Sequence, residues 1–138
     1  MFKNILLAVD GSSHAMHAAE VAGELARRME ARLWVVIAYD PVPAYLGEPN
    51  MQQAMDARLN EAQSVLDEAL KAVGKIPGEL RTEVLEGPPA EAILNVANTR
   101  KSDLIIMGSR GMGRLNILLG SQCQKVVNHA LCPVLIVR

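Results

Sequence analysis

The chain has 138 residues and a mass of 14.9 kDa, which is enough for one buried core but too little for two domains. Its formal net charge of −1 and pI of about 6.3 exclude the overall basic field typical of a nucleic-acid-binding protein. Half of the residues are hydrophobic, but no apolar run approaches the roughly 20 residues that a membrane span needs.

Five apolar runs of strand length follow one another along the chain. The runs at 4–9, 33–38, 104–107 and 134–137 are continuously apolar, which is typical of parallel strands covered on both faces. The run at 80–86, "LRTEVLE", alternates between apolar and polar residues. We therefore expect this strand at an exposed edge of the sheet.

Segments of helical periodicity separate the strands. The first has an apolar stripe at Ala18, Ala22, Leu25 and Met29. The second is longer, and we expect its stripe to be core; it consists of Met51, Met55, Leu59, Ala62, Leu66, Ala69 and Val73.

Two shorter helices are predicted at 89–100 and at about 119–130, the latter ending before Pro133. Residues 39–50 form the one long loop and are rich in proline. The order βαβαβαβαβ with right-handed crossovers predicts a doubly wound α/β fold, a five-stranded parallel sheet of order 3-2-1-4-5 with four helices. We expect residues 1–138 to form a single domain.

In such a sheet, ligands bind beyond the carboxyl ends of the strands, where the strand order reverses. The reversal in the order 3-2-1-4-5 lies between the first and fourth strands. The first strand ends in "DGS" (10–12) and the fourth in "MGS" (107–109). The predicted topology therefore brings two polar, glycine-containing turns together.

The segment "MGSRGMGRLNILLGS" (107–121) has four glycines next to an apolar strand. It is not a Walker A loop, because Arg114 and Leu115 stand where that motif needs Lys and a hydroxyl residue. It is not the dinucleotide-binding motif GxGxxG either, because the third glycine is replaced by Asn116.

Two glycine clusters remain, Gly108 with Gly111 after a strand and Gly120 with Ser121 at the head of a helix. A helix N-terminus offers unpaired N–H groups and the positive end of the helix dipole, which together bind phosphate. The side chain of Arg110 adds positive charge nearby. The same residues also suit tight turns and a plain helix N-cap.

Five segments carry a family resemblance that extends over nearly the whole chain. They are "ILLAVDGS" at the start, "EGPPAEAIL" (86–94), "SDLIIMGSRG" (102–111), "LLGS" (118–121) and "HALCPVLIVR" (129–138). In sequence and order they resemble single-domain, nucleotide-binding universal stress proteins, whose fold is of the adenine nucleotide α-hydrolase type. That family's ATP-binding pattern is Gly, two residues, Gly, nine residues, Gly, then Ser or Thr. Here eight residues (112–119) precede the last glycine.

The resemblance implies an ATP site with Mg²⁺ bound alongside the phosphates. Asp10 would contact the ribose and lie near that metal. Ala8 would line the adenine pocket, and the backbone of Ala38 would bind the adenine edge. The remaining implied contacts are Met107 and Gly108 to base and ribose, and Gly111, Gly120, Ser121 and Gln122 to the phosphates, with Arg110 close by.

No nucleophile and general base can be assembled with confidence from the sequence, which has three histidines. We therefore expect a nucleotide-dependent regulatory or stress-tolerance switch with at most slow ATP hydrolysis. Two alternatives stay open. One is a dimeric interaction protein that binds no nucleotide, and the other is an ATP α-hydrolase that releases AMP.

Several further features concern partners and location. The last strand, within 133–138, is apolar and ends the chain at a sheet edge, and with the family resemblance it predicts a homodimer through that edge. No secretory signal or membrane segment is evident, so we expect a cytoplasmic protein with free Cys123 and Cys132. His14 and His17 are spaced for a metal but lack a third ligand, so we expect them to be solvated.

Overall fold

The protein folds around a parallel five-stranded sheet in the computed structural model, which describes residues 1–109 and 120–138. The strand order is β3-β2-β1-β4-β5, and every neighbouring pair is parallel, as predicted. The strands are β1 (Asn4–Val9), β2 (Arg32–Tyr39), β3 (Leu80–Glu86), β4 (Leu104–Gly108) and β5 (Val134–Val137). The alternating strand β3 lies at one edge, which confirms that prediction.

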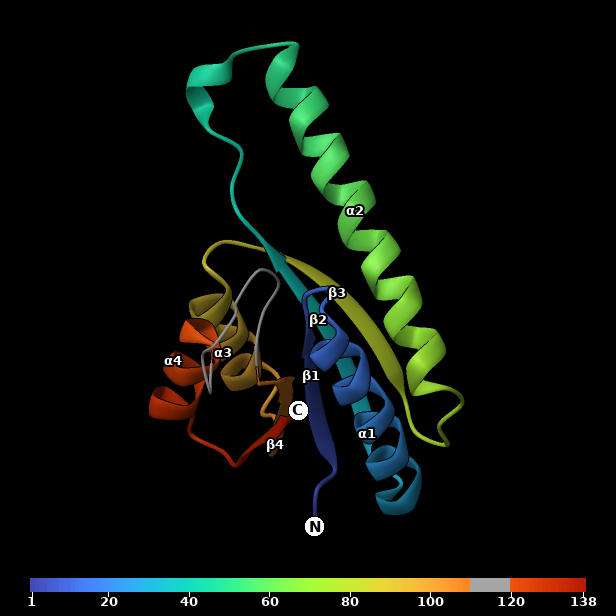
Figure 1. Cartoon of the computed structure of the whole chain (residues 1–138). Helices are drawn as coiled ribbons and strands as arrows, with labels where there is room; N and C mark the ends of the chain where they lie inside the picture. Colours follow the sequence, from blue (N-terminus) through green and yellow to red (C-terminus); the bar gives the residue numbers. More distant parts are fainter. Residues whose placement is uncertain (110–119) are drawn as a thin grey trace.

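Helices cover both faces of the sheet (Figure 1). They are α1 (Ser13–Met29), α2 (Asn50–Val73), α3 (Pro89–Thr99) and α4 (Ser121–His129), with a short 3₁₀ helix η1 (Ala44–Leu46) before α2. The helices α1 and α2 lie on one face, and α3 and α4 lie on the other. The predicted bounds agree with these to within about two residues wherever the structure describes them.

The period of two along the strands divides the core into two layers. On β1, Ile5 and Leu7 pack with α1 and α2, while Leu6 and Ala8 pack with α3 and α4. Leu6 and Leu7 are both fully buried, because helices cover this central strand on both sides. Burial of β1 on both faces explains why the run at 4–9 is continuously apolar.

The amino-terminal half of α2 does not reach the core. From Ala62 to Val73 the predicted stripe is buried, but Met51 and Met55 are half-buried and Leu59 is 38% exposed. The prediction that this part of the stripe is core was therefore wrong. Residues 40–61, which we call the arm, project beyond the carboxyl ends of the strands (Figure 1).

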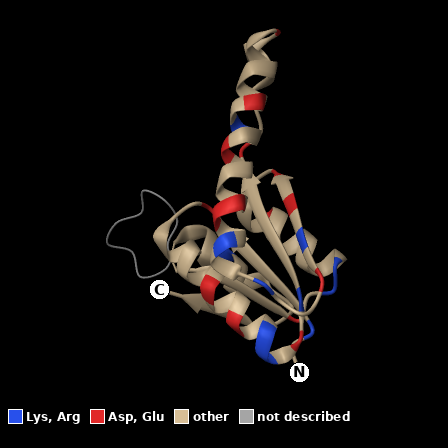
Figure 2. Cartoon of the chain, turned by 90° about the vertical axis from the view of Figure 1, so that its right-hand side faces the viewer, with Lys and Arg blue, Asp and Glu red and all other residues tan. Residues whose placement is uncertain are grey.

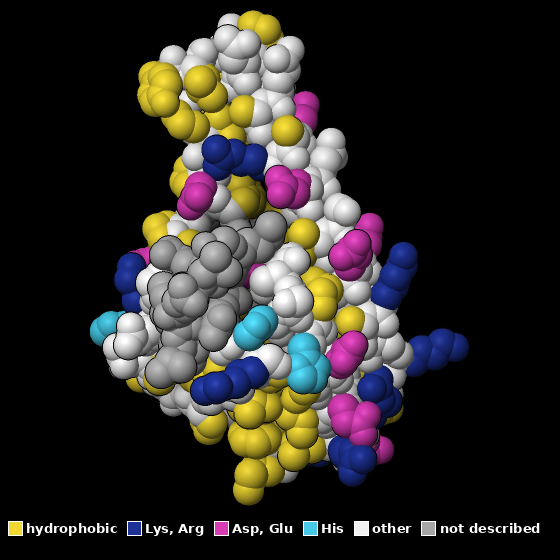
Figure 3. All heavy atoms as spheres, viewed as in Figure 1, with side chains coloured by type: hydrophobic (Ala, Val, Ile, Leu, Met, Phe, Trp, Pro, Cys, Tyr) yellow, Lys and Arg dark blue, Asp and Glu magenta, His cyan; other side chains and the backbone are white. Residues whose placement is uncertain are grey.

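The surface of the arm is apolar at its tip and charged lower down (Figure 3). Tyr45 is 88% exposed there, and Leu46 is partly exposed. At the arm's base, the guanidinium group of Arg58 donates to the backbone oxygens of Asp40 and Pro41. This contact ties the loop after β2 to the side of α2.

Acidic and basic residues are interspersed over the ribbon rather than gathered by sign (Figure 2). This distribution agrees with the formal net charge of −1. Within 1–109 and 120–138, no helix combines the length and hydrophobicity that crossing a membrane requires.

The packing of α1 against α2 depends on a glycine. A Cβ atom at Gly23 would lie 3.0 Å from Val73 Cα and closer still to the Val73 carbonyl oxygen. We expect Gly23→Ala to lower the free energy of unfolding by about 1–3 kcal/mol, because this overpacking outweighs alanine's higher helix propensity. Urea unfolding followed by circular dichroism measures the change.

Glu20→Ala, at an exposed position of the same helix, is the control and should leave stability nearly unchanged. A Gly23→Ala protein that is as stable as the wild type would show that α1 and α2 do not approach each other so closely.

Candidate functional site

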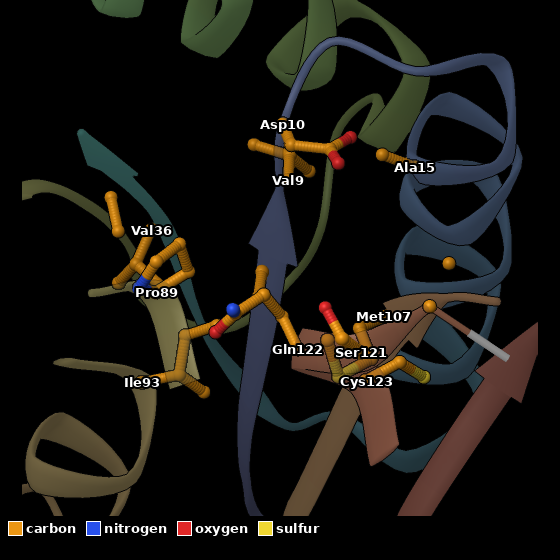
Figure 4. A pocket seen from close by; sticks show the side chains of 14 residues that line it. Val9, Asp10, Ala15, Val36, Pro89, Ile93, Met107, Ser121, Gln122 and Cys123 are labelled. Atoms are coloured by element: carbon orange, nitrogen blue, oxygen red, sulfur yellow. The ribbon is translucent and has the colours of Figure 1, made fainter. Parts of the chain in front are cut away.

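A hollow of about 110 Å³ lies beyond the carboxyl ends of the central strands (Figure 4). It opens between β1 and β4, where the strand order reverses, as the topology predicts. Its lining residues are Ala8, Val9, Asp10, Ala15, Val36, Ala38, Pro89, Ile93, Met107, Gly108, Gly120, Ser121, Gln122 and Cys123.

Eight of the site residues predicted from the sequence line this hollow. They are Ala8, Asp10, Ala38, Met107, Gly108, Gly120, Ser121 and Gln122. The two others, Arg110 and Gly111, lie outside the described residues. The structure therefore brings together every predicted site residue that it describes, from β1, β2, β4 and α4.

The turn after β1 fixes Asp10 at the mouth of the hollow. One carboxylate oxygen, Oδ1, accepts a hydrogen bond from the Ser12 backbone N–H at 3.0 Å, and Gly11 has a φ of 85°. Ser12 is the N-cap of α1, and its hydroxyl accepts from the Ala15 N–H. Asp10 itself thus shapes the turn and stays exposed.

The end of β4 packs tightly against the first turn of α1. A Cβ atom at Gly108 would lie 2.8 Å from the backbone carbon of His14, so only glycine fits there. The next residue, Ser109, is 1% exposed, and its Oγ lies 2.7 Å from His14 Nδ1.

Both histidines of α1 have hydrogen-bond partners. His14 is partly buried, so the expectation that it is solvated was wrong, whereas His17 is exposed as expected. The second, His17, bonds through Nδ1 to the backbone oxygen of Arg138. Together with the His14 contact, this ties α1 to the ends of β4 and β5. Sequence spacing placed both histidines on one helix face but could not show which strand ends lie opposite.

The amino terminus of α4 forms another wall of the hollow. Gly120 is its N-cap, and the Gly120 N–H donates to the Ser109 oxygen at 2.7 Å. In an α-helix, the N–H groups of the first turn lack partners within the helix and mark the positive end of its dipole. Ser121, Gln122 and Cys123 of this turn all line the hollow.

The wall formed by α3 was not predicted as part of the site. Pro89 and Ile93 line the hollow, and Gln122 Oε1 accepts a hydrogen bond from the Ala90 N–H at 3.0 Å. This bond satisfies an N–H in the first turn of α3, whose N-cap residue Pro88 has no side-chain capping bond. Gln122 thus joins α4 to α3 across the hollow.

The thiol of Cys123 faces the same hollow but is not a reactive group. Burial raises its pKa to about 11, so it is neutral at physiological pH. Both cysteines are free. Among the residues that the structure describes, no group of three or more His, Cys, Asp and Glu side chains could hold a metal ion by itself.

The model of the universal stress protein family matches residues 1–138. A universal stress protein of Thermus aquaticus, from the QAH/OAS sulfhydrylase 3′ region, is 54% identical over 139 residues, which cover all of both chains.

The chain belongs to the universal stress protein family.

Solved universal stress proteins share the fold. UspA from Lactobacillus plantarum superposes with a TM-score of 0.88 at 29% identity, covering 99% of this chain and 98% of that one. A universal stress protein in complex with cAMP superposes with a TM-score of 0.69 at 29% identity, covering 99% and 97% of the two chains. The resemblance inferred from the sequence is therefore confirmed.

The hydrogen bond between the Ala90 N–H and Gln122 Oε1 can be tested for its contribution to stability. We expect Gln122→Leu to lower the free energy of unfolding by about 1–3 kcal/mol, because the part-buried Ala90 N–H loses its acceptor. Gln122→Glu keeps an acceptor oxygen at this position and should stay near wild-type stability. Urea unfolding compares the two, and equal losses would contradict this role of the side chain.

Proposed function

We propose that this universal stress protein binds ATP in the hollow and acts as a nucleotide-dependent regulatory switch in stress tolerance. The observation that carries the proposal is the position of the hollow. It lies where the strand order reverses, and glycine, an exposed carboxylate and a helix N-terminus surround it.

One side of the hollow suits the adenine base. Val36, Pro89 and Ile93 gather on one side in Figure 4 and provide apolar contacts for a flat ring. Ala8 and Ala38 have small side chains that leave room for it. The backbone at the end of β2 offers hydrogen bonds to the edge of the base.

The opposite side suits ribose and phosphates. Asp10 and Ser121 lie to the right of the apolar side chains in Figure 4. The Asp10 carboxylate uses Oδ1 in its turn, which leaves Oδ2 for a ribose hydroxyl or for Mg²⁺. The first turn of α4 would bind phosphate oxygens through backbone N–H groups. The ligand set fits Mg²⁺ held jointly by phosphates and Asp10, since hard cations prefer oxygen ligands.

The side chains around the hollow support binding rather than rapid catalysis. Ser109 is buried, so its hydroxyl is not presented as a nucleophile. The Cys123 thiol is neutral because burial raises its pKa. We therefore expect slow hydrolysis at most, and a role in which bound ATP changes the surface that a protein partner contacts.

The comparison structures also favour an adenine nucleotide. The universal stress protein in complex with cAMP is 29% identical to this chain, and the superposition covers 97% of that protein. That ligand shares the base, ribose and a phosphate with ATP.

Occupation of the hollow can be tested by filling it. We expect Ala38→Leu to weaken ATP binding by at least about tenfold, because the added methylene groups enter the space that the base needs. Calorimetry with Mg²⁺ and ATP, ADP, AMP or cAMP measures the affinities. Acid treatment of the purified wild-type protein should also release bound nucleotide.

Ala57→Leu is the matched control, because Ala57 is exposed on the arm. This variant should bind ATP with the affinity of the wild type. No heat with any of these nucleotides would contradict the proposal and favour a scaffold for protein interaction. Rapid release of AMP from ATP would instead identify an α-hydrolase.

We further propose that two copies pair through β5 within a homodimer. β5 is the last strand of the sheet order, and Leu131, which precedes it in the chain, is 86% exposed. The Ile105 N–H donates to the Pro133 oxygen, and the Ser109 N–H donates to the Val137 oxygen. The backbone N–H and C=O groups of successive strand residues point to opposite sides of the strand. Those of Val134 and Ile136 therefore point away from β4. An unpaired edge of this kind is a template for another strand.

A proline substitution in β5 tests whether its outer edge forms the dimer. We expect the wild-type protein to have twice the 14.9 kDa mass of one chain by light scattering at micromolar concentration. Val134→Pro removes one outward N–H and leaves the hydrogen bonds of Pro133 and Val137 to β4 in place, so it should shift the protein toward the monomer. Circular dichroism checks that the variant is folded. A wild-type monomer would contradict the proposed dimer.

A further inference from the structure

A second cavity, of about 190 Å³, lies at the opposite end of the sheet. The amino ends of β1, β2 and β3 and the segment after α3 form it, far along the strands from the nucleotide hollow. Its lining includes Arg32, Trp34, Glu79, Arg81 and Arg100.

Three arginines surround one tryptophan in this cavity. Trp34 and Arg81 are register partners on β2 and β3, so their side chains share one face of the sheet. Arg32 lies two residues before Trp34 and faces the same way. The Arg100 guanidinium, from the end of α3, stacks on the indole with its Cζ 4.4 Å from the ring centroid.

The guanidinium groups retain free donor capacity. Arg100 pairs through Nη2 with Glu83 Oε1 at 3.6 Å, and Arg81 pairs through Nε with Glu79. Each guanidinium has five N–H donors, so these pairs use only part of them. Arg32 has no ion pair among the described residues. Three positive charges thus face two carboxylates, which leaves an excess of positive charge.

The indole N–H supplies the second observation. Trp34 Nε1 and Glu83 Oε2 are buried, and neither has a hydrogen-bond partner within the described part of the chain. Buried polar groups in folded proteins nearly always have a partner, so an acceptor is missing here. An acceptor that approaches Trp34 from the cavity would also meet the arginines.

We propose that this cavity binds a small oxyanion, a carboxylate or phosphate group of a free metabolite, between Trp34 and the three arginines. Oxyanion oxygens accept charge-assisted hydrogen bonds from guanidinium groups. The indole N–H is buried, so it donates to the bound oxyanion only after a small shift of the ring. Arg100 holds the ring in place by stacking and through its pair with Glu83. This site is independent of the proposed nucleotide site.

Trp34 is the single tryptophan of the chain, so its fluorescence and its indole N–H resonance report on this cavity alone. We expect inorganic phosphate, added at constant ionic strength, to give a saturable change in fluorescence and a saturable shift of the indole resonance. Succinate in a parallel titration distinguishes a carboxylate from a phosphate preference, and sodium chloride measures the effect of salt.

Arg81→Gln is the test variant. Arg81 is exposed, and its substitution leaves the stacking of Arg100 on Trp34 intact. We expect it to weaken binding by about tenfold, the effect of one lost charge-assisted hydrogen bond. Arg28→Gln, at an exposed arginine of α1, is the matched control and should bind as the wild type does.

Ala38→Leu should also keep the full response, which separates this cavity from the nucleotide hollow. Responses that do not saturate, that chloride reproduces, or that Arg81→Gln leaves unchanged would overturn the proposal and show a general salt effect only.

Discussion

The central position of β1 is the constraint on which the rest of the structure depends. The chain starts in the middle of the sheet, adds β2 and β3 on one side, and then crosses to add β4 and β5 on the other. The helix that follows β1 therefore lies on one face of the sheet, and the helix that follows β4 lies on the other. A sheet with this strand order has a crevice at the point where the order reverses, and the hollow lies there.

Close backbone packing keeps that hollow in shape. The first turn of α1 contacts the backbone of β4 at Gly108. The side-chain hydrogen bond between His14 and Ser109 holds the same two elements together. The Gly120 N–H donates to Ser109 as well, so the start of α4 is held to the same strand end. Three elements thus meet at one buried serine, and the walls that face a ligand are preorganised by contacts behind them.

Much of this arrangement could be predicted from the sequence because it depends on local patterns. Continuous apolar runs identified buried parallel strands, and the glycine turns identified the strand ends that line the hollow. The contribution of α3 could not be predicted in the same way. Gln122 joins Ala90 across 32 positions, and nothing in the local sequence of either residue indicates that contact. The partners of His14 and His17 were missed for the same reason.

The arm shows a different limit of sequence patterns. An apolar stripe with period 3.6 shows that a helix has one apolar face, but it does not show how far the surface that covers this face extends. The sheet ends near the middle of α2, so the stripe is buried from Ala62 onward and half-exposed before it. Residues of high helix propensity and the hydrogen bond between Gln52 and Asp56 stabilise the uncovered turns locally.

This difference between formation and burial has a functional consequence. A helix that continues beyond its sheet adds surface rather than core, and the arm places that surface above the carboxyl ends of the strands, where the hollow opens. Its attachment at Arg58 joins it to the loop that leaves β2, the strand whose end contains Ala38. The arm is thus connected to the end of β2 both along the chain and through the hydrogen bonds of Arg58. The exposed apolar tip therefore lies beyond the same end of the sheet as the hollow, and its exposure follows from the length of α2 rather than from any defect in the core.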